Sequence, residues 1–278
     1  MRGKTVLVTG ATSGLGRRLA GDLATRGATV LLHGRDEHRL HAVAQELRGT
    51  AAAVRTYCAD LADLDQVREL TERLRDAEPR LDVLVNNAGL GGGSDPARRE
   101  TGPQGYELRL TVNHLAPYLL IQELAPLLAA SAPARVVNVA SSGQVPIALD
   151  DVMMQRGYQG IHAYCRSKVA LIMATFDLAA DLAGRGITVN ALHPAELMDT
   201  AMVRRSGFAP AATVADGAAA TMRLIEDPAL DGVTGQYFDR FTAAPAHPQV
   251  YDETARARIR VVTEQLTGLQ PFSGLPGA

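Results

Sequence analysis

The chain has 278 residues, of which 46% are hydrophobic and 21% are charged, and its formal net charge is −2. This hydrophobic content excludes a disordered chain, and the near-neutral charge argues against a nucleic-acid partner or an acidic membrane surface. No apolar run reaches the roughly 18 residues of a bilayer span, and no signal peptide is expected. The two cysteines, Cys58 and Cys165, form no CxxC pair, which excludes a disulfide scaffold and a zinc site. These observations favour a soluble, cytoplasmic protein without a metal.

Short apolar runs alternate with longer helical patterns, which predicts a parallel sheet built from βαβ units. The predicted strands are 5–9, 29–33, 54–59, 81–86, 135–140, 187–192 and 236–238. The predicted helices are 15–26, one beginning at Asp36, one beginning at Asp63 or Asp65, a Pro-interrupted one over 106–128, one over about 163–183 and a polar one over 252–266. We therefore expect one doubly wound α/β (Rossmann) domain with about seven parallel strands over residues 1–240. Residues 241–278 are expected to pack on the same domain as an extension.

Residues 9–16 spell TGATSGLG and lie between the first predicted strand and the first predicted helix. Glycines in such a turn let the backbone approach a pyrophosphate closely, and the positive end of the helix dipole faces the phosphates. The alternative is an ordinary tight turn, but the position of the motif favours a dinucleotide site. The predicted cofactor contacts in this turn are Gly10, Thr12, Ser13, Gly14, Leu15 and Gly16.

The end of the second predicted strand bears on which dinucleotide binds. An acidic residue at this place usually bonds the ribose 2′-hydroxyl of NAD, whereas Arg35 is suited to grip the 2′-phosphate of NADP. Asp36 is either the ribose ligand or the N-cap of the following helix. Arg35 favours NADP(H) over NAD(H), and it argues against a glycine-rich methyltransferase, which also needs an acid here.

Further motifs follow in an order that resembles the short-chain dehydrogenase/reductase family, in the single-domain subtype with a TGxxxGxG turn. The motifs are Asp60-Leu61 after the third strand, residues 86–89 (NNAG) after the fourth, Asn113 in the long helix, Ser141 after the fifth strand, Tyr164 with Lys168, and residues 190–194 at the sixth strand. The resemblance covers about residues 4–240. The stretch 235–238, with the helix after it, is similar to the retinol-dehydrogenase-like branch.

The resemblance implies where a cofactor would lie. The implied contacts are to the adenine from Asp60 and Leu61, to the cofactor ribose from Asn87, Ala88 and Gly89, and to the nicotinamide amide from Pro194. Taken singly, the same residues are also compatible with ordinary turns and a strand-end cap. Together with the glycine turn, they favour the cofactor site.

Tyr164 and Lys168 are four residues apart, so on a helix they share one face. Reduction of a carbonyl by hydride needs a proton donor, and a free tyrosine, with a pKa of about 10, exchanges protons poorly at neutral pH. The Lys168 ammonium is expected to stabilise the phenolate and to lower that pKa. The resemblance implies that Lys168 also holds the nicotinamide ribose hydroxyls. Without this context, the two residues are compatible with an exposed helical pair.

Ser141 or Ser142 is expected to donate a hydrogen bond that polarises the substrate carbonyl, and alignment with the family's fifth strand selects Ser141. Asn113 matches the family's fourth catalytic residue. The resemblance implies that Asn113 interrupts helical hydrogen bonding and holds a water that relays protons to Lys168. The alternative for Asn113 is a buried asparagine at a kink near Pro117.

The sequence departs from the family pattern at three places. Ala195 stands where the family usually has glycine, Thr200 lies farther along than the usual threonine, and 22 residues separate Ser141 from Tyr164. The insert 143–162 either forms one wall of the substrate pocket or is a surface excursion. The candidate pocket residues are 91–93, 145–147, Met153 and 198–203. Their mixed apolar character favours a hydrophobic ketone or alcohol.

We therefore expect an NADP(H)-dependent oxidoreductase that moves a hydride between the nicotinamide and a small-molecule carbonyl or alcohol. The alternatives are a non-redox lyase or cyclase on the same fold, and an NADP(H)-binding sensor without turnover. The presence of all four candidate catalytic residues argues against a sensor. Residues 106–128 and 163–183 are apolar on more than one helical face, which together with the resemblance favours a homodimer or homotetramer.

Overall fold

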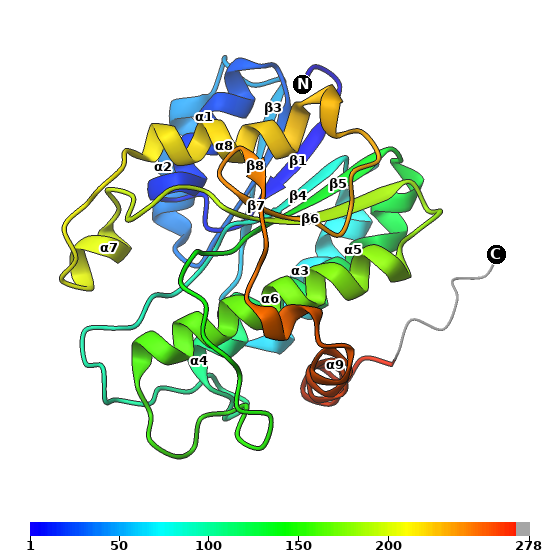
Figure 1. Cartoon of the computed structure of the whole chain (residues 1–278). Helices are drawn as coiled ribbons and strands as arrows, with labels where there is room; N and C mark the ends of the chain where they lie inside the picture. The colour runs from blue at the N-terminus through cyan, green and yellow to red at the C-terminus, as the bar shows by residue number, and fades with distance from the viewer. Residues whose placement is uncertain (271–278) are drawn as a thin grey trace.

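In the computed structural model, which describes residues 1–270, eight strands form one sheet in the order β3-β2-β1-β4-β5-β6-β7-β8 (Figure 1). The strands are β1 (Thr5–Val8), β2 (Thr29–Gly34), β3 (Ala53–Cys58), β4 (Val83–Asn86), β5 (Ala134–Val139), β6 (Ile187–His193), β7 (Tyr237–Asp239) and β8 (Thr242–Ala243). Among the strands of residues 1–270, only β7 and β8 pair antiparallel. All seven predicted strands are confirmed, and the two-residue β8 was not predicted. The strand order reverses between β1 and β4, the place where such folds bind ligands.

Helices cover both faces of this sheet (Figure 1). One layer holds α1 (Gly14–Thr25), α2 (Glu37–Leu47) and α8 (Val214–Glu226), and the other holds α3 (Leu64–Ala77), α5 (Ala116–Ala130) and α6 (Gly160–Asp181). The remaining helical segments are α4 (Leu108–Leu110), the π-helix η1 (Thr111–Leu115), α7 (Ala201–Arg205), η2 (Pro228–Leu230), η3 (Pro248–Tyr251) and α9 (Glu253–Thr267). Every residue of β1 and β4 is buried, because strands covered on both faces need apolar residues throughout. The predicted doubly wound domain is confirmed.

Side-chain caps fix where the helices begin. Asp36 accepts a hydrogen bond from the Arg39 amide and caps α2. Asp63, rather than Asp65, caps α3. Helix α8 was not predicted, although Thr213 and Asp216 form a capping box at its start.

The long helix predicted over residues 106–128 consists of three pieces. A π-turn, η1, joins α4 to α5 and contains Asn113. Pro117 stands in the first turn of α5, directly after the π-turn, and Pro126 lies inside α5. The predicted interruption of helical bonding at Asn113 is therefore confirmed, and π-turns of this kind concentrate at functional sites.

The C-terminal extension packs on the domain through α9. Arg256 and Arg260 pair with Asp177 and Asp181 of α6, both at 2.9 Å, and the ring of His114 in η1 hydrogen-bonds Thr263. Helix α9 covers part of the α6 surface that the sequence offers for a subunit interface. Residues 271–278 of the predicted extension lie outside the described residues.

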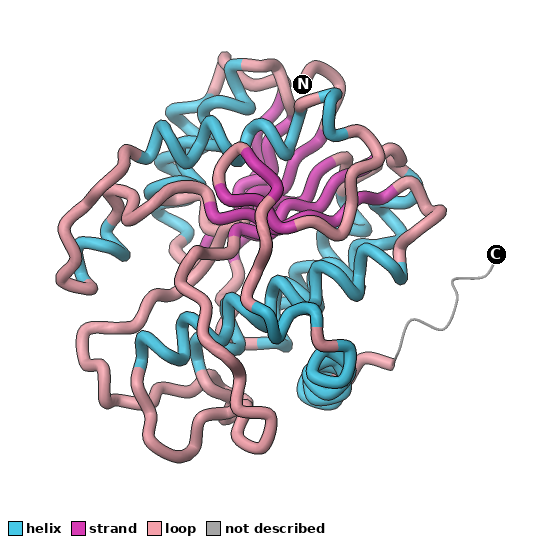
Figure 2. Tube along the Cα trace, viewed as in Figure 1, coloured by secondary structure: helices cyan, strands magenta, loops and turns pink. Residues whose placement is uncertain are grey.

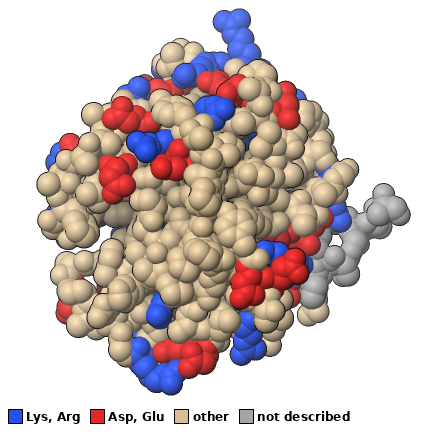
Figure 3. Space-filling model, in the orientation of Figure 1, with Lys and Arg blue, Asp and Glu red and all other residues tan. Residues whose placement is uncertain are grey.

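Long loops gather around α4 and the first turn of α6 (Figure 2). On the face seen in Figure 3, lysine and arginine side chains lie beside aspartate and glutamate side chains. Within residues 1–270, no helix has the length and hydropathy needed to cross a bilayer. The same residues contain no cluster of three His, Cys, Asp or Glu that could hold a metal ion.

Candidate active site

The glycine turn, residues 9–16, has a backbone that side chains would obstruct. Gly10 and Gly14 have φ values of +67° and +51°, in the left-handed region that favours glycine. A Cβ on Gly16 would overlap the carbonyl oxygen of Gly10 and would come within 2.5 Å of Asn87 Nδ2. Ser13 precedes α1 without a side-chain cap, so the first amides of α1 have no such partner. The turn therefore has the form of an anion cradle at a helix N-terminus.

Side chains from neighbouring strands hold this turn in place. Thr9 Oγ1 accepts hydrogen bonds from the amides of Asn87 and Ala88, at 2.9 and 3.0 Å. Asn87 Nδ2 donates to the Thr9 carbonyl at 2.8 Å. These contacts bring the end of β4 against the glycine turn. The contact of Asn87, Ala88 and Gly89 with a cofactor ribose, which the resemblance implies, stays a prediction.

His33 is a further anchor of the turn, and it was not predicted. Its Nδ1 lies 3.4 Å from the Gly10 amide that donates to it, and its Nε2 lies 3.1 Å from the carbonyl oxygen of Ala59. Burial lowers the pKa of His33 to about 4, so the ring is neutral at neutral pH. Nε2 therefore carries the proton and Nδ1 accepts. The histidine after the apolar residues of β2 was the sequence feature that could have indicated this role.

The two candidates for cofactor discrimination differ in the structure. Arg35 is exposed and makes no ion pair with the rest of residues 1–270, whereas Asp36 is engaged as the cap of α2 and pairs with Arg39. Asp60 accepts a hydrogen bond from the Ala62 amide at 3.0 Å. Leu61 packs into the hydrophobic core, which leaves only its backbone for an adenine.

Residues after β6 also approach the glycine turn, at Gly14. Pro194 is buried, and Thr200 caps α7. The Thr200 methyl group lies 3.3 Å from the position that a Cβ would take on Gly14. Thr200 is thus next to the glycine turn. Met198, predicted to line the substrate pocket, packs against Gly217 of α8.

Ser141 and Tyr164 lie together at the carboxyl end of β5. Both side chains come within 4 Å of the same point, the Cβ position at Gly143. Ser141 Oγ accepts the Gly143 amide at 3.0 Å, and the Ser141 carbonyl accepts hydrogen bonds from Tyr237 and Gln144. The neighbouring Ser142 hydroxyl instead donates to a Glu196 carboxylate oxygen. The contacts of Tyr237 and Gln144 were not predicted.

Lys168 lies one helical turn below Tyr164 and is almost fully buried. Its ammonium donates to the Val139 carbonyl at 2.8 Å, and its Nζ is 5.9 Å from the centre of the Tyr164 ring. Burial lowers the pKa of Lys168 to about 8. The Cβ position at Gly89 lies 3.5 Å from Lys168 Nζ and 3.2 Å from Asn113 Oδ1. The structure therefore brings Asn113, Lys168 and the end of β4 together.

The structure differs from the sequence analysis on the acidity of Tyr164. Burial raises the pKa of Tyr164 above its usual value, and a side-chain hydrogen bond with Ser141 opposes that rise. The Lys168 ammonium, 5.9 Å from the ring centre, donates its hydrogen bond to the Val139 carbonyl rather than to the Tyr164 hydroxyl. The pKa of Tyr164 is therefore raised overall in the chain by itself, and the predicted lowering of this pKa by Lys168 stays a prediction.

Asn113 binds protein atoms on three sides. Its Oδ1 accepts the Leu90 amide at 2.8 Å, and its Nδ2 donates to the Leu90 carbonyl and to Ser167 Oγ, both at 2.9 Å. Asn113 thus ties η1 to the segment after β4 and to α6. The buried-asparagine alternative is consistent with these contacts. The predicted water relay stays a prediction.

The insert 143–162 is more than a surface excursion. Ile147 is buried in the core, and its backbone makes two hydrogen bonds with the Gln249 side chain. Tyr158 reaches a buried arginine, Arg109. Neither Arg109 nor its partner Glu107 was predicted as part of the site. Their charges within an apolar helical run were the sequence feature that could have indicated a functional role.

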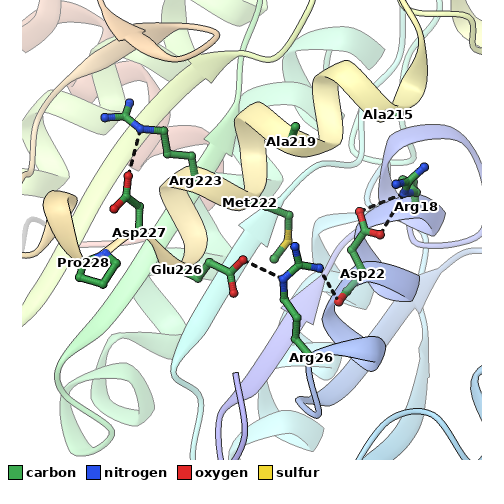
Figure 4. Close-up of a pocket in the computed structure, with 10 residues that line it drawn as sticks. All are labelled: Arg18, Asp22, Arg26, Ala215, Ala219, Met222, Arg223, Glu226, Asp227 and Pro228. Atoms are coloured by element: carbon green, nitrogen blue, oxygen red, sulfur yellow. Dashed lines mark hydrogen bonds and ion pairs between the residues drawn. The ribbon is translucent and has the colours of Figure 1, made fainter.

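A groove of about 600 Å³ lies between α1 and α8, in the layer opposite α6 (Figure 4). Its three arginines are each paired with a neighbouring carboxylate. The pairs are Arg18–Asp22, Arg26–Glu226 and Arg223–Asp227. The groove therefore differs from the Tyr164 site in both place and chemistry, and we assign it no ligand.

Comparisons with known proteins agree with this geometry. Residues 4–209 match the family described as short chain dehydrogenase. Human retinol dehydrogenase 13 is 34% identical over 290 aligned residues, which cover 96% of this chain and 86% of that protein.

Solved structures show the same fold. A protein from Mycobacterium paratuberculosis is 28% identical with a TM-score of 0.79, covering 97% of this chain and 95% of the other. A short chain dehydrogenase from Escherichia coli CFT073, solved with NADPH, is 30% identical with a TM-score of 0.72, covering 87% of this chain and 98% of the other. The chain therefore belongs to the short-chain dehydrogenase/reductase family of oxidoreductases.

Proposed function

We propose that the chain is an NADPH-dependent carbonyl reductase, able to run in reverse as an alcohol dehydrogenase, with Tyr164 as the general acid. The observation that carries this proposal is the grouping of Ser141 and Tyr164, with the Lys168 ammonium one helical turn away. A proton donor beside a second hydroxyl is what a carbonyl oxygen needs as it gains negative charge.

The glycine turn supports the choice of a dinucleotide. The Cβ contacts at Gly10 and Gly16 show a backbone that only glycine can form, and the start of α1 offers amides to a pyrophosphate. Arg35, exposed and without an ion pair in residues 1–270, supports NADPH over NADH because a guanidinium binds a 2′-phosphate. When bound, the nicotinamide supplies the hydride.

The protonation states support the reductive direction. Because burial raises the pKa of Tyr164, its hydroxyl keeps its proton at neutral pH. The raised pKa also makes this hydroxyl a weaker acid, so donation depends on the nearby Lys168 ammonium to stabilise the phenolate that is left. Ser141 is positioned to polarise the carbonyl, whereas Ser142 is engaged with Glu196. Lys168, with a pKa of about 8, keeps its charge at neutral pH and loses it as the pH rises through that value. Reduction should therefore weaken above about pH 8.

An apolar substrate fits the residues around the site. Met202 of α7 and Ile161 of α6 lie beside the glycines that follow β4. Relatives that include retinol dehydrogenase 13 support a hydrophobic alcohol, aldehyde or ketone. We further propose a cytoplasmic location and a homodimer or homotetramer.

Replacement of the Tyr164 hydroxyl tests the function. Tyr164→Phe should lower turnover of NADPH with a panel of hydrophobic ketones by about 10²–10⁴-fold, the usual contribution of a positioned acid. The Kd of NADPH should stay nearly unchanged. Tyr251→Phe, on an exposed tyrosine of η3, is the matched control and should keep full activity.

Two outcomes would overturn the proposal. Undiminished ketone reduction by Tyr164→Phe would exclude its role as the acid. Formation of a product without oxidation of NADPH would indicate a lyase or cyclase instead.

A further inference from the structure

The segment that follows β4 contains three consecutive glycines, and two side chains hold it. We call residues 89–93 the glycine segment. Asn113 takes both backbone groups of Leu90, at 2.8 and 2.9 Å. Arg109 takes the next two carbonyls, those of Gly91 at 3.1 Å and Gly92 at 3.3 Å. Asn113 therefore holds the end of the segment nearer to β4, and Arg109 holds the part after it. Arg109 precedes Asn113 by four residues in the continuous helical run of α4 and η1.

Arg109 is a buried charge whose guanidinium makes four hydrogen bonds. Its side chain is only 2% exposed. One terminal nitrogen donates to Tyr158 Oη at 2.8 Å, and the other donates to Glu100 at 2.9 Å. The carboxylate of Glu107 lies 3.6 Å from the first of these nitrogens. A buried guanidinium needs this many partners to offset its lost hydration.

Glu107 and Tyr158 close the network on the other side. Tyr158 donates to Glu107 Oε1 at 2.8 Å, and Glu107, the N-cap of α4, accepts the Leu110 amide with its Oε2. Burial and the neighbouring Glu107 raise the pKa of Tyr158, so it stays protonated and continues to donate. Arg109 thus links the glycine segment to the insert 143–162, which carries Tyr158.

The glycine segment in turn touches the two elements around the candidate active site. A Cβ on Gly91 would stand 3.0 Å from Met202 of α7, and a Cβ on Gly160 in the first turn of α6 would overlap the Gly92 carbonyl. The Gly160 amide also donates to the Pro96 carbonyl at 2.7 Å. Tyr164 follows Gly160 by four residues. A shift of the segment would therefore move the surroundings of the Tyr164 hydroxyl.

We propose that Arg109 is a positioning residue that sets the substrate-facing wall formed by the glycine segment and the insert 143–162. It acts through the Gly91 and Gly92 carbonyls and Tyr158, and it touches neither cofactor nor reacting atoms. The role in substrate binding rests on the proposed reductase function. The wall itself rests only on the contacts of Arg109.

The test compares two changes in the network with a matched control. Arg109→Lys keeps the charge but loses the planar fork that reaches several acceptors at once. Tyr158→Phe removes a single hydroxyl and is the milder variant. Arg98→Lys, on an exposed arginine of the same loop, is the control. Each protein is measured for kcat and KM with a hydrophobic ketone, Kd for NADPH, and hydrogen exchange of its peptides.

A distinct pattern is expected. For Arg109→Lys, KM should rise about tenfold, while kcat changes less than about threefold and the Kd of NADPH less than about twofold. Tyr158→Phe should show a smaller shift of the same kind. Faster hydrogen exchange should be confined to peptides from 89–101 and 143–160. Arg98→Lys should match the unmodified chain.

Other patterns would overturn the proposal. A merely structural role would lower the active fraction, so kcat would fall while KM stays constant and exchange would rise throughout the domain. Unchanged exchange in both segments would also overturn it. If the unmodified chain reduces no carbonyl while binding NADPH, the proposed function fails, and hydrogen exchange alone decides whether Arg109 holds the wall.

Discussion

The glycine turn at residues 9–16 and the glycine segment at residues 89–93 both bring bare backbone to the candidate site, but different groups hold them. Thr9, Asn87 and His33 hold the turn from adjacent strands of one sheet. The segment depends on Arg109, which stands in a short helix outside the sheet. The turn is therefore fixed by the register of the sheet. The segment is fixed by a buried charge network, which can be altered without unfolding the sheet.

This difference separates tasks within one domain. A dinucleotide offers the same phosphates to every relative, so a turn built into the sheet suits it. Substrates differ, and a wall held by side chains and loops can change shape at small cost to the core. Changes in the turn should therefore affect folding and cofactor together, whereas changes in the wall should affect substrate alone.

The largest effect is expected at Gly16. In Gly16→Ala, the Cβ would overlap the Gly10 carbonyl, and backbone cannot yield as a flexible side chain does. Unfolding free energy should fall by about 3 kcal/mol, at the upper end for overpacking, and the Kd of NADPH should rise by about 100-fold. Denaturant unfolding and fluorescence titration measure the two quantities.

The same helix supplies the control. Gly21 lies in α1 with no atom within 4 Å of its Cβ position. Gly21→Ala should stabilise the chain by about 0.5–1 kcal/mol, because alanine is the better helix former. NADPH binding should not change. Equal effects of the two substitutions would remove the distinction drawn for the turn.

The second prediction concerns pH and His33. Its pKa in the folded chain is about 4, against 6.5 for the exposed group. As the pH falls below 6.5, the unfolded chain takes up a proton that the folded chain refuses, so stability falls until about pH 4. At about 1.4 kcal/mol per pKa unit, this one residue accounts for about 3 kcal/mol.

His114 provides the comparison for His33. It too is buried and neutral, with its pKa lowered to about 3, but it contacts Thr263 of α9 rather than the turn. Replacement of either histidine by glutamine should flatten the loss of stability in acid. Only His33→Gln should also weaken NADPH binding. If His114→Gln weakens it equally, His33 is not a specific anchor of the turn.

Much of the first region was predictable because its causes are local. Glycine spacing, a strand before it and a helix after it dictate the turn, and β-branched runs dictate the strands. The identities of Ser141, Tyr164 and Lys168 came from motif order. The composition also singles out Lys168. Among the lysine and arginine positions of the chain, only residues 4 and 168 are lysine.

The second region was not predictable in the same way. Arg109 meets Tyr158 across 49 positions of sequence, and no local pattern shows that two loops will close around one guanidinium. The raised pKa of Tyr164 was missed for a related reason. Spacing places Lys168 near it, but the carbonyl of Val139, from another element, takes the ammonium.

The third prediction is that replacement of Lys168 by an apolar residue makes the folded chain more stable. Burial of the charged form lowers the pKa of Lys168 from 10.5 to about 8, which corresponds to about 3 kcal/mol of destabilisation at neutral pH. Lys168→Met should therefore raise the unfolding free energy by about 2 kcal/mol, after about 1 kcal/mol for the lost hydrogen bond to Val139. Turnover should be abolished.

Two measurements check the Lys168 prediction. For the unmodified chain, stability should rise as the pH increases from about 8 towards 10.5, because the unfolded chain still holds a proton that the folded chain has released. Thermal melts should show this rise and its absence in Lys168→Met. A less stable variant would show that Lys168 is a net stabiliser.

The smallest effect is expected directly after β2, where Arg35 and Asp36 lie. The prediction tests which of these two residues determines cofactor choice. Arg35→Ala should raise the Kd of NADPH about tenfold, near 1.4 kcal/mol, and leave that of NADH unchanged, because only NADPH carries the 2′-phosphate. Asp36→Ala should cost about 1 kcal/mol of stability through the lost cap of α2 and should leave both Kd values unchanged. If Asp36→Ala weakens NADH instead, Asp36 is a ribose ligand. Cofactor choice would then depend on the capping residue rather than on the free arginine beside it.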